Sequence, residues 1–250
     1  MIHTFKPLRA GRFVVQLKEI SIGDSISVLS MSPGEYEAET TAFLRAALKS
    51  VEGPQDPADW TVEERILAVC HYLAATLEKP DFDVQGGGHF SDYLVNLGET
   101  SIPDHAELGE IAGDRWSVYP LTGRMAETIE GLQGELKDTA GKPVPPRLHW
   151  LVGAMAAQLL REGETVTPPE SPSYESFLLE RMRILRELPE SAFIELFTAF
   201  AKGRDSISRF FVTRFDGSGV IVCSKEEGAD LPPARFPSRA CLSDFAAQLV

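Results

Sequence analysis

The segment from Trp60 to Ala74 is the feature that most constrains the fold of this chain. Its Thr61 is followed three residues later by Glu64, the signature of a capping box, in which each side chain satisfies a backbone N–H at the start of a helix. The apolar residues that follow recur three and four positions apart, so they share one helix face. We therefore expect a buried helix that begins at Thr61 and stops at Lys79-Pro80.

Both ends of the chain show the alternation of apolar and polar side chains that is typical of strands. In residues 1–31 it runs from Phe13 to Val28 around Gly23-Asp24, and it predicts a β-hairpin with its turn at that dipeptide. This ribbon either completes a sheet in its own domain or adds a strand to a neighbouring protein. Near the other end, apolar runs flank Asp216-Gly217-Ser218-Gly219 and predict a second hairpin.

The middle of the chain has mainly helical periodicity. Ser32-Pro33 predicts a helix start with Ser32 as the N-cap, and Gly203 predicts a helix end. The segment 81–120 is rich in glycine and is expected to be an irregular excursion with brief helix or strand pieces. Further helices are predicted at residues 121–136, 147–161, 174–188, 191–202 and 242–249.

These patterns predict an α+β fold with a mainly helical middle and β hairpins at the N-terminal and C-terminal ends. The chain divides into an N-terminal β segment (1–31), a helical body that includes the irregular excursion (32–202), and a C-terminal β hairpin and tail (203–250).

The net charge of the chain disfavours two classes of binding partner. Its 250 residues carry a formal net charge of −13, which disfavours general binding to nucleic acid or to an anionic membrane, because both require clustered lysine and arginine. No stretch reaches the roughly 20 apolar residues that cross a bilayer, and the polar start lacks the apolar run of a signal peptide. We therefore expect a protein that is made in the cytoplasm and associates through specific protein surfaces.

Two short motifs share residue types with catalytic sites but lack their full pattern. Gly86-Gly87-Gly88-His89 has neither the Lys-Ser/Thr pair of a phosphate loop nor the spacing of a dinucleotide loop, so it is interpreted as a flexible turn. Cys70 and His71 are adjacent in the expected helix and point about 100° apart, so they do not face each other as nucleophile and base. Cys70 lies on the apolar face and is expected in the core.

No metal site or cofactor is expected. Cys223 and Cys241 are isolated and the histidines are spread along the chain, whereas structural zinc sites show close ligand pairs. Acidic groups such as Glu35, Glu37 and Glu39 are interpreted as solvated helix faces.

An enzyme with a site built from scattered residues is an alternative. His89, Asp114, Arg115 and His149 are its first candidates, around the 81–120 excursion, because long loops in compact domains are often functional. A cytoplasmic helical adaptor or regulatory protein is a further alternative.

Aromatic residues gather toward the end of the helical body. Phe193, Phe197 and Phe200 are spaced to share one helix face, and Phe210 and Phe211 follow shortly after. They either fill the core between the last helix and the C-terminal hairpin, or they form an interface with another copy or a partner.

The string Asp59-Trp-Thr-Val-Glu-Glu-Arg-Ile-Leu-Ala-Val69 resembles a helix start in a protein family of contractile-tailed phages, where an aromatic residue precedes Thr-Val-Lys-Glu-Glu. That family comprises small baseplate hub components and their assembly factors. The resemblance implies an N-terminal β segment (here 13–31), a helical middle, and a C-terminal hairpin (here Asp216–Gly219).

The resemblance also implies a structural role and no catalytic residues. Its expected partners are other tail and baseplate proteins, met as a homo- or hetero-oligomer, and its expected location is the baseplate of the virion. Some members of the family carry a cysteine-rich C-terminal piece, of which this chain has only Cys223.

Overall fold

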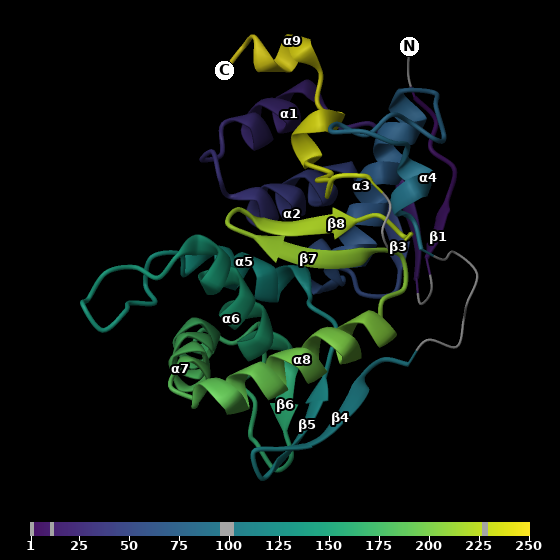
Figure 1. Cartoon of the computed structure of the whole chain (residues 1–250). Coiled ribbons are helices and arrows are strands. Elements are labelled where there is room, and N and C mark those ends of the chain that lie inside the picture. Colours follow the sequence, from purple (N-terminus) through teal and green to yellow (C-terminus); the bar gives the residue numbers. More distant parts are fainter. Residues whose placement is uncertain (1–2, 11–12, 96–102, 227–229) are drawn as a thin grey trace. The chain divides into compact units, whose positions relative to one another are not determined.

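The computed structural model describes residues 3–10, 13–95, 103–226 and 230–250 (Figure 1). Helices and small antiparallel sheets make up the fold, with strands near both ends of the chain, so the predicted α+β class is confirmed. The chain forms two compact units. Unit 1 consists of Met1–Thr100, Arg209–Arg214 and Ile221–Val250, and unit 2 consists of Ser101–Ser208 and Phe215–Val220.

The two units have different element content. Unit 1 contains β1 (Leu8–Ala10), β2 (Phe13–Leu17), α1 (Ile22–Leu29), α2 (Tyr36–Ala47), β3 (Leu48–Glu52), η1 (Pro57–Asp59), α3 (Val62–Thr76), α4 (Phe90–Tyr93), η2 (Ser238–Cys241) and α9 (Asp244–Ala247). Unit 2 contains β4 (Ala106–Ile111), β5 (Asp114–Val118), α5 (Gly123–Gly131), α6 (Pro146–Gln158), β6 (Leu159–Arg161), α7 (Tyr174–Arg186) and α8 (Glu190–Ser206). The C-terminal hairpin predicted around Asp216–Gly219 is confirmed as β7 (Val212–Asp216) and β8 (Gly219–Cys223), and each of its strands has residues in both units.

The sheet of unit 1 is antiparallel, in the order β1-β2-β3. Val15 in its central strand lies opposite Leu8 on one side and Val51 on the other, and Leu17 lies opposite Leu48. Val15 and Leu17 are buried, so the alternation read from the sequence correctly predicts this strand and its core face.

The second half of the predicted N-terminal hairpin is wrong. Residues Ile22–Leu29 form helix α1, and Gly23-Asp24 lies in its first turn. A local cap explains the difference: the Ser21 side chain accepts a hydrogen bond from the N–H of Asp24 at 3.1 Å, which favours a helix start at this point. Ile22 and Ile26 are four residues apart, a spacing that fits a strand and a helix equally well.

Helix α3 follows the sequence prediction closely. The Glu64 carboxylate accepts the Thr61 N–H at 2.8 Å, and the Thr61 side chain accepts the Glu64 N–H at 3.2 Å, so the capping box is present. The preceding helix α2 differs, because it begins at Tyr36 and its N-cap is Glu35 instead of Ser32. The carbonyl of Ser32 instead accepts the Glu35 N–H in a turn at 3.2 Å.

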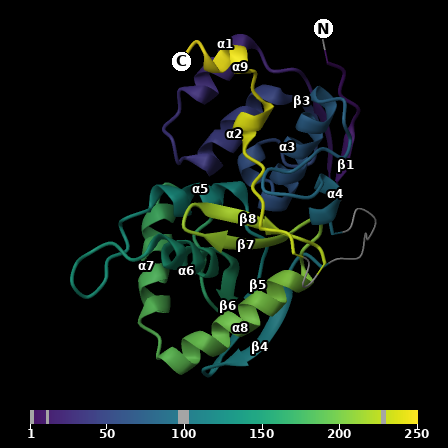
Figure 2. The same cartoon turned by 45° about the horizontal axis from the view of Figure 1, so that its top comes forward.

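Unit 2 pairs its strands in the order β4-β5-β6. The helix predicted at 147–161 ends at Gln158, and the next three residues form strand β6, in which Leu159 lies opposite Val118 and Arg161 lies opposite Trp116. Pairing with β5 therefore replaces the last helical turn, a long-range effect that helical periodicity cannot reveal. Figure 2 shows α6 and α7 side by side in this unit.

Helix α8 runs through Gly203, which was predicted to cap it, and ends at Ser206. Figures 1 and 2 show α8 lying across β4 and β5. A Cβ atom at position 203 would overlap Leu108 Cδ2 and lie 2.8 Å from Val118 Cγ1. Gly203 is thus a close-packing site between helix and sheet, where no side chain fits.

No helix in the described ranges is both long and apolar enough to cross a membrane.

Candidate functional site

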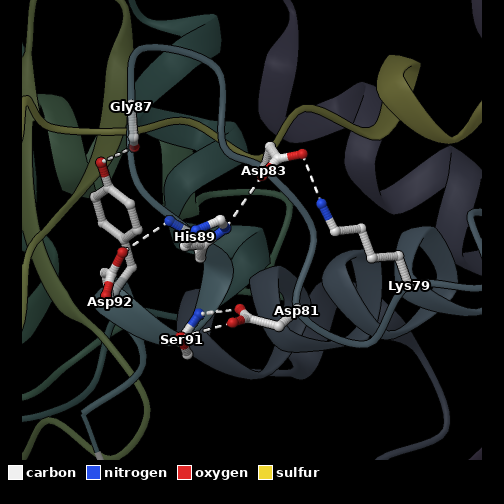
Figure 3. A network of polar contacts seen from close by, with 8 residues as sticks. Lys79, Asp81, Asp83, Gly87, His89, Ser91 and Asp92 are labelled. Carbon is white, nitrogen blue, oxygen red and sulfur yellow. Dashed lines mark hydrogen bonds and ion pairs between the residues drawn. The ribbon is translucent and has the colours of Figure 1, made fainter.

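The loop that follows α3 carries a network of exposed polar contacts (Figure 3). Asp83 contacts two basic side chains: one carboxylate oxygen lies 2.6 Å from Lys79 Nζ, and the other lies 3.1 Å from His89 Nδ1. Asp81 accepts hydrogen bonds from the Ser91 N–H at 2.8 Å and from the Ser91 hydroxyl at 3.0 Å. The network therefore fastens the two arms of the loop to each other.

The glycine run at the tip of this loop is a tight turn with defined hydrogen bonds. Gly86, Gly87 and Gly88 all have positive φ, at 106°, 133° and 77°, which other residues rarely adopt. The Tyr93 hydroxyl lies 3.1 Å from the Gly87 carbonyl and 2.8 Å from the Pro232 carbonyl. This turn was interpreted from the sequence as flexible. The two hydrogen bonds of the Tyr93 hydroxyl instead connect the turn to the segment around Pro232.

The carboxylates of the loop do not form an acid–base pair. Hydrogen bonding from the Ser91 backbone lowers the pKa of Asp81, and the Lys79 ammonium lowers the pKa of Asp83. General acid–base catalysis by two carboxylates requires pKa values that are pushed apart, whereas these two move in the same direction. Within the described residues, no group of three or more metal-ligating side chains comes together either.

The residues proposed for a scattered active site are divided between the two units. His89 belongs to unit 1, whereas Asp114, Arg115 and His149 belong to unit 2. Asp114 pairs with Arg161 at 3.4 Å, and Arg115 lies 3.9 Å from a glutamate, so both make surface ion pairs.

His149 is buried in unit 2, and its Nε2 lies 2.7 Å from the Ile129 carbonyl. Burial lowers the pKa of His149, so the ring is neutral near pH 7 and donates its Nε2 proton to that carbonyl. A side chain that is enclosed in this way serves helix packing and cannot reach a substrate.

Two of the three cysteines, Cys70 and Cys241, have pKa values raised by burial. Cys70 is fully buried, as expected from its helix position, and burial raises its pKa. Cys241 is also held as a thiol, because burial raises its pKa, and its Sγ lies 3.6 Å from the Val69 carbonyl. The imidazole of His71 contacts the Lys6 carbonyl at 2.8 Å instead of a thiol. Nucleophilic cysteines have lowered pKa values, which is the opposite change.

Glu63 is a structural residue that sequence reasoning missed. One of its carboxylate oxygens accepts three consecutive backbone N–H groups, from Arg209 at 2.8 Å, Phe210 at 2.7 Å and Phe211 at 3.2 Å. A carboxylate that satisfies several N–H groups makes strong, charge-assisted hydrogen bonds. Glu63 thus fixes the start of the C-terminal hairpin to the first turn of α3. No local pattern reports a partner 146 residues away.

The interpretation of Glu37 and Glu39 as solvated is wrong. Glu39 is buried, accepts the Ser238 hydroxyl at 2.7 Å and pairs with the Arg239 guanidinium. Glu37 pairs with the buried Arg65 at 3.2 Å. Buried charges are tolerated when they are paired, and these pairs tie α2 to α3 and to the C-terminal segment of unit 1.

Three of the five predicted interface aromatics lie in the core instead. Phe200, Phe210 and Phe211 are buried, Phe200 in unit 2 and the other two in unit 1. Phe193 is half-buried, and Phe197 is 36% exposed. Phe210 and Phe211 belong to the core of unit 1, and the buried Phe200 ring lies 5.5 Å from the Arg204 guanidinium.

The outer face of α8 carries exposed apolar side chains. Ile194 is 54% exposed and was not singled out from the sequence, and Phe197 lies one turn along on the same side. Ala201 continues this apolar line, while Leu196, Phe200 and Gly203 occupy the buried face. The spacing 194, 197 and 201 was readable in the sequence as a second apolar stripe that shares Phe197 with the aromatic one and lies next to it.

Unit 1 carries a groove of about 410 Å³ between α1, the end of α3 and the segment near Cys241. Tyr72 lies in its lining, and the hydroxyl of Tyr72 accepts the Ile20 N–H at 3.2 Å. Ile22 and Leu77, about half exposed, also line it. His3 and Glu19 are also among the lining residues, and the Glu19 carboxylate accepts the His3 backbone N–H at 3.1 Å.

Comparison of the chain with family models, with curated proteins and with solved structures finds no match.

Proposed function

We propose that this protein is a structural component of the baseplate of a contractile-tailed phage, either a hub or hub-proximal subunit or a factor for baseplate assembly, and that it acts through protein–protein contacts. The observation that supports this most is the part played by the segment Asp59–Val69, which carries the resemblance to baseplate hub proteins. Its side chains connect the first turn of α3 to other segments of unit 1.

Each polar or aromatic position of that segment has a structural partner. Trp60 is fully buried and its Nε1 donates to the Pro54 carbonyl at 2.8 Å. Thr61 and Glu64 form the capping box, and Glu63 binds the start of the C-terminal hairpin. A generic helix start needs only its capping residues, whereas here several positions of the segment each make a separate contact within unit 1. Such a segment supports a fold in common with the baseplate hub family more strongly than a generic helix start does.

The surface of the chain is consistent with association. Exposed large apolar side chains that lie next to one another mark interaction sites more often than single ones do, and Ile194 and Phe197 are adjacent on α8. Under this proposal the partners are other tail and baseplate proteins, and the protein resides in the virion or leaves it after assembly.

The genome context and a gene disruption test the proposal. The gene is expected beside genes for tail-tube, tape-measure and baseplate proteins. A phage with the gene interrupted by a stop codon should yield heads without complete tails in electron micrographs, and a plasmid copy should restore tails and titre. Normal tails and titre without any copy would overturn the proposal.

A tagged copy expressed during infection separates the two forms of the proposal. If the protein is a subunit, mass spectrometry of purified virions should contain it together with baseplate proteins. If it is an assembly factor, it should co-purify with baseplate proteins from the lysate and be absent from virions. Enrichment of metabolic enzymes, with no baseplate protein in either sample, would favour the enzymatic alternative.

A further inference from the structure

The groove of unit 1 holds two buried hydroxyl groups that have unused hydrogen-bonding capacity. Ser25 in α1 and Tyr72 in α3 line the groove and are 5% and 2% exposed. Among the described residues, the Ser25 hydroxyl has no hydrogen-bond partner, and the Tyr72 hydroxyl accepts the Ile20 N–H but donates its own proton to no acceptor. Each can therefore bond a ligand in the groove without breaking a contact within the protein.

The Ser25 hydroxyl differs from those of the neighbouring serines. Ser27 donates to the Gly23 carbonyl at 2.9 Å, and Ser30 at the C-cap makes the same kind of bond to the carbonyl four residues earlier. Both of these serines are exposed, whereas Ser25 lies on the buried side of α1 with Val28. Ser25 thus places a hydroxyl where an apolar side chain would pack, and α1 itself does not use it.

A carboxylate also lies at the groove, and the described lining includes no lysine or arginine. Glu19 accepts the His3 N–H through one oxygen at 3.1 Å, and it makes no ion pair within the described part of the chain. The next residue, Ile20, is bonded to the Tyr72 hydroxyl, which holds the Glu19 backbone beside that buried group. A cation is complementary to this lining, whereas an anion would meet a carboxylate.

The groove has the size and composition of a small-molecule site. Its volume of about 410 Å³ lies within the roughly 300–1,000 Å³ of ligand sites, which combine apolar walls with a few polar groups that orient the ligand. The C-terminal segment forms one side of it, because η2 packs on α3 and α9 packs on α1 (Figures 1 and 2). Apolar side chains line it from α1, from the end of α3 and from this segment, namely Ile22, Leu73, Leu77 and Leu242.

We propose that this groove binds a small organic amine with an apolar body and an oxygen that accepts a hydrogen bond. The ammonium group pairs with the Glu19 carboxylate, and the apolar body lies against Ile22 and Leu77. The oxygen lies at the buried hydroxyls of Ser25 and Tyr72. The inference goes beyond the proposed function, because a baseplate subunit needs no small ligand, and its failure would leave that role intact.

Tyramine tests the proposal, because it carries an ammonium group, an aromatic body and a phenol oxygen. Saturation-transfer NMR titration of the full chain should give a Kd of roughly 0.1–1 mM, as expected for a ligand of this size. Tyrosol replaces the ammonium group with a neutral hydroxyl and should bind about threefold to tenfold more weakly. 4-Hydroxyphenylacetate carries a carboxylate instead and should bind weaker by about tenfold or more. 2-Phenylethylamine lacks the oxygen and should lose about threefold to tenfold.

Two variants test which groups of the protein bind the ligand. Glu19→Gln should raise the Kd for tyramine about threefold to tenfold and leave the Kd for tyrosol unchanged, because the neutral ligand makes no ion pair. Ser25→Ala should raise the Kd for tyramine by a similar factor of about three to ten and leave that for 2-phenylethylamine unchanged. Ser25→Ala should also keep or raise Tm, because the hydroxyl has no partner within the described residues and alanine is the better helix former. A purely structural role of Ser25 would lower Tm.

The controls remove the same groups outside the groove. Glu52→Gln removes an exposed carboxylate on β3, and Ser27→Ala removes an exposed hydroxyl on α1, so both should leave the Kd for tyramine unchanged. Equal binding of tyramine and 4-hydroxyphenylacetate would overturn the proposal, as would no binding of tyramine up to about 5 mM. Effects of the controls equal to those of Glu19→Gln and Ser25→Ala would overturn it as well.

Discussion

Gly203→Ala is expected to destabilise unit 2 even though alanine is the better helix former. The added Cβ would overlap Leu108 Cδ2 and lie 2.8 Å from Val118 Cγ1, both on the sheet beneath α8. Overpacking of a core contact costs about 1–3 kcal/mol. Replacing a glycine within a helix by alanine returns about 0.5–1 kcal/mol. Because two contacts lie below 3 Å, the cost falls in the upper half of that range, about 2–3 kcal/mol, and the net loss is about 1–2.5 kcal/mol of unfolding free energy.

The assay is thermal unfolding followed by circular dichroism, where this loss corresponds to a fall in Tm of roughly 2–10 °C for a chain of this size. Gly131→Ala is the matched control, because it is also helical and a Cβ there meets no atom within 4 Å. The control should be neutral or slightly more stable than the wild type.

The partner of the clash is tested with Leu108→Ala. In the double variant with Gly203→Ala, the loss should be smaller than the sum of the two single losses, since the methyl group gains the space that leucine occupied. A Gly203→Ala protein as stable as the wild type, with the control behaving as expected, would refute close packing as the reason for the glycine.

Three further changes are expected to have measurable effects. Glu63→Gln keeps an oxygen acceptor but loses its charge, so urea unfolding should show a loss of about 1 kcal/mol; an unchanged midpoint would contradict the anchoring role. Burial lowers the pKa of His149 in the folded protein, so the unfolded state binds more protons below about pH 6.5, and stability should fall as the pH drops through that value. His149→Gln should flatten this dependence between pH 7.5 and 5.5, and an equally steep curve would exclude this histidine as its source. Gly88→Ala combines a positive φ of 77° with a Cβ 2.9 Å from an Asp92 oxygen, so it should cost more in unfolding free energy than Gly113→Ala, where φ is 86° and the space is open; equal costs would rule out the contact.

The sequence predicts elements whose signals are local. Helix α3 is specified by a capping box, an apolar face and a proline stop within 20 residues, and the C-terminal hairpin by Asp216-Gly217 between apolar runs. Helix α1 is missed because the apolar spacing fits two structures and only Ser21 decides between them. Strand β6 is missed because its pairing partner β5 lies some 40 residues earlier in the chain.

The same distinction applies to the candidate surface. A helical wheel of 190–206 separates the buried line of Leu196, Phe200 and Gly203 from the exposed line of Ile194 and Phe197, so the outer face could have been found from the sequence. Phe210 and Phe211, which follow the helix, could not be assigned in this way. Their burial depends on which segments cover them, and that is decided by contacts distant in the chain.

Residues of α2 and α3 in unit 1 bind partners near the C-terminal end of the chain, and this affects the order in which the two units fold during synthesis on the ribosome. Glu63 emerges 146 residues before the first of its three N–H donors, and Glu39 emerges 199 residues before Ser238. At bacterial to eukaryotic elongation rates, the first interval lasts roughly 7–30 s. During that time α2 and α3 exist without the partners that bury their carboxylates, while most of unit 2 is already complete. Unit 2 is therefore expected to fold first although it is encoded second, and unit 1 to close only when the last part of the chain is released.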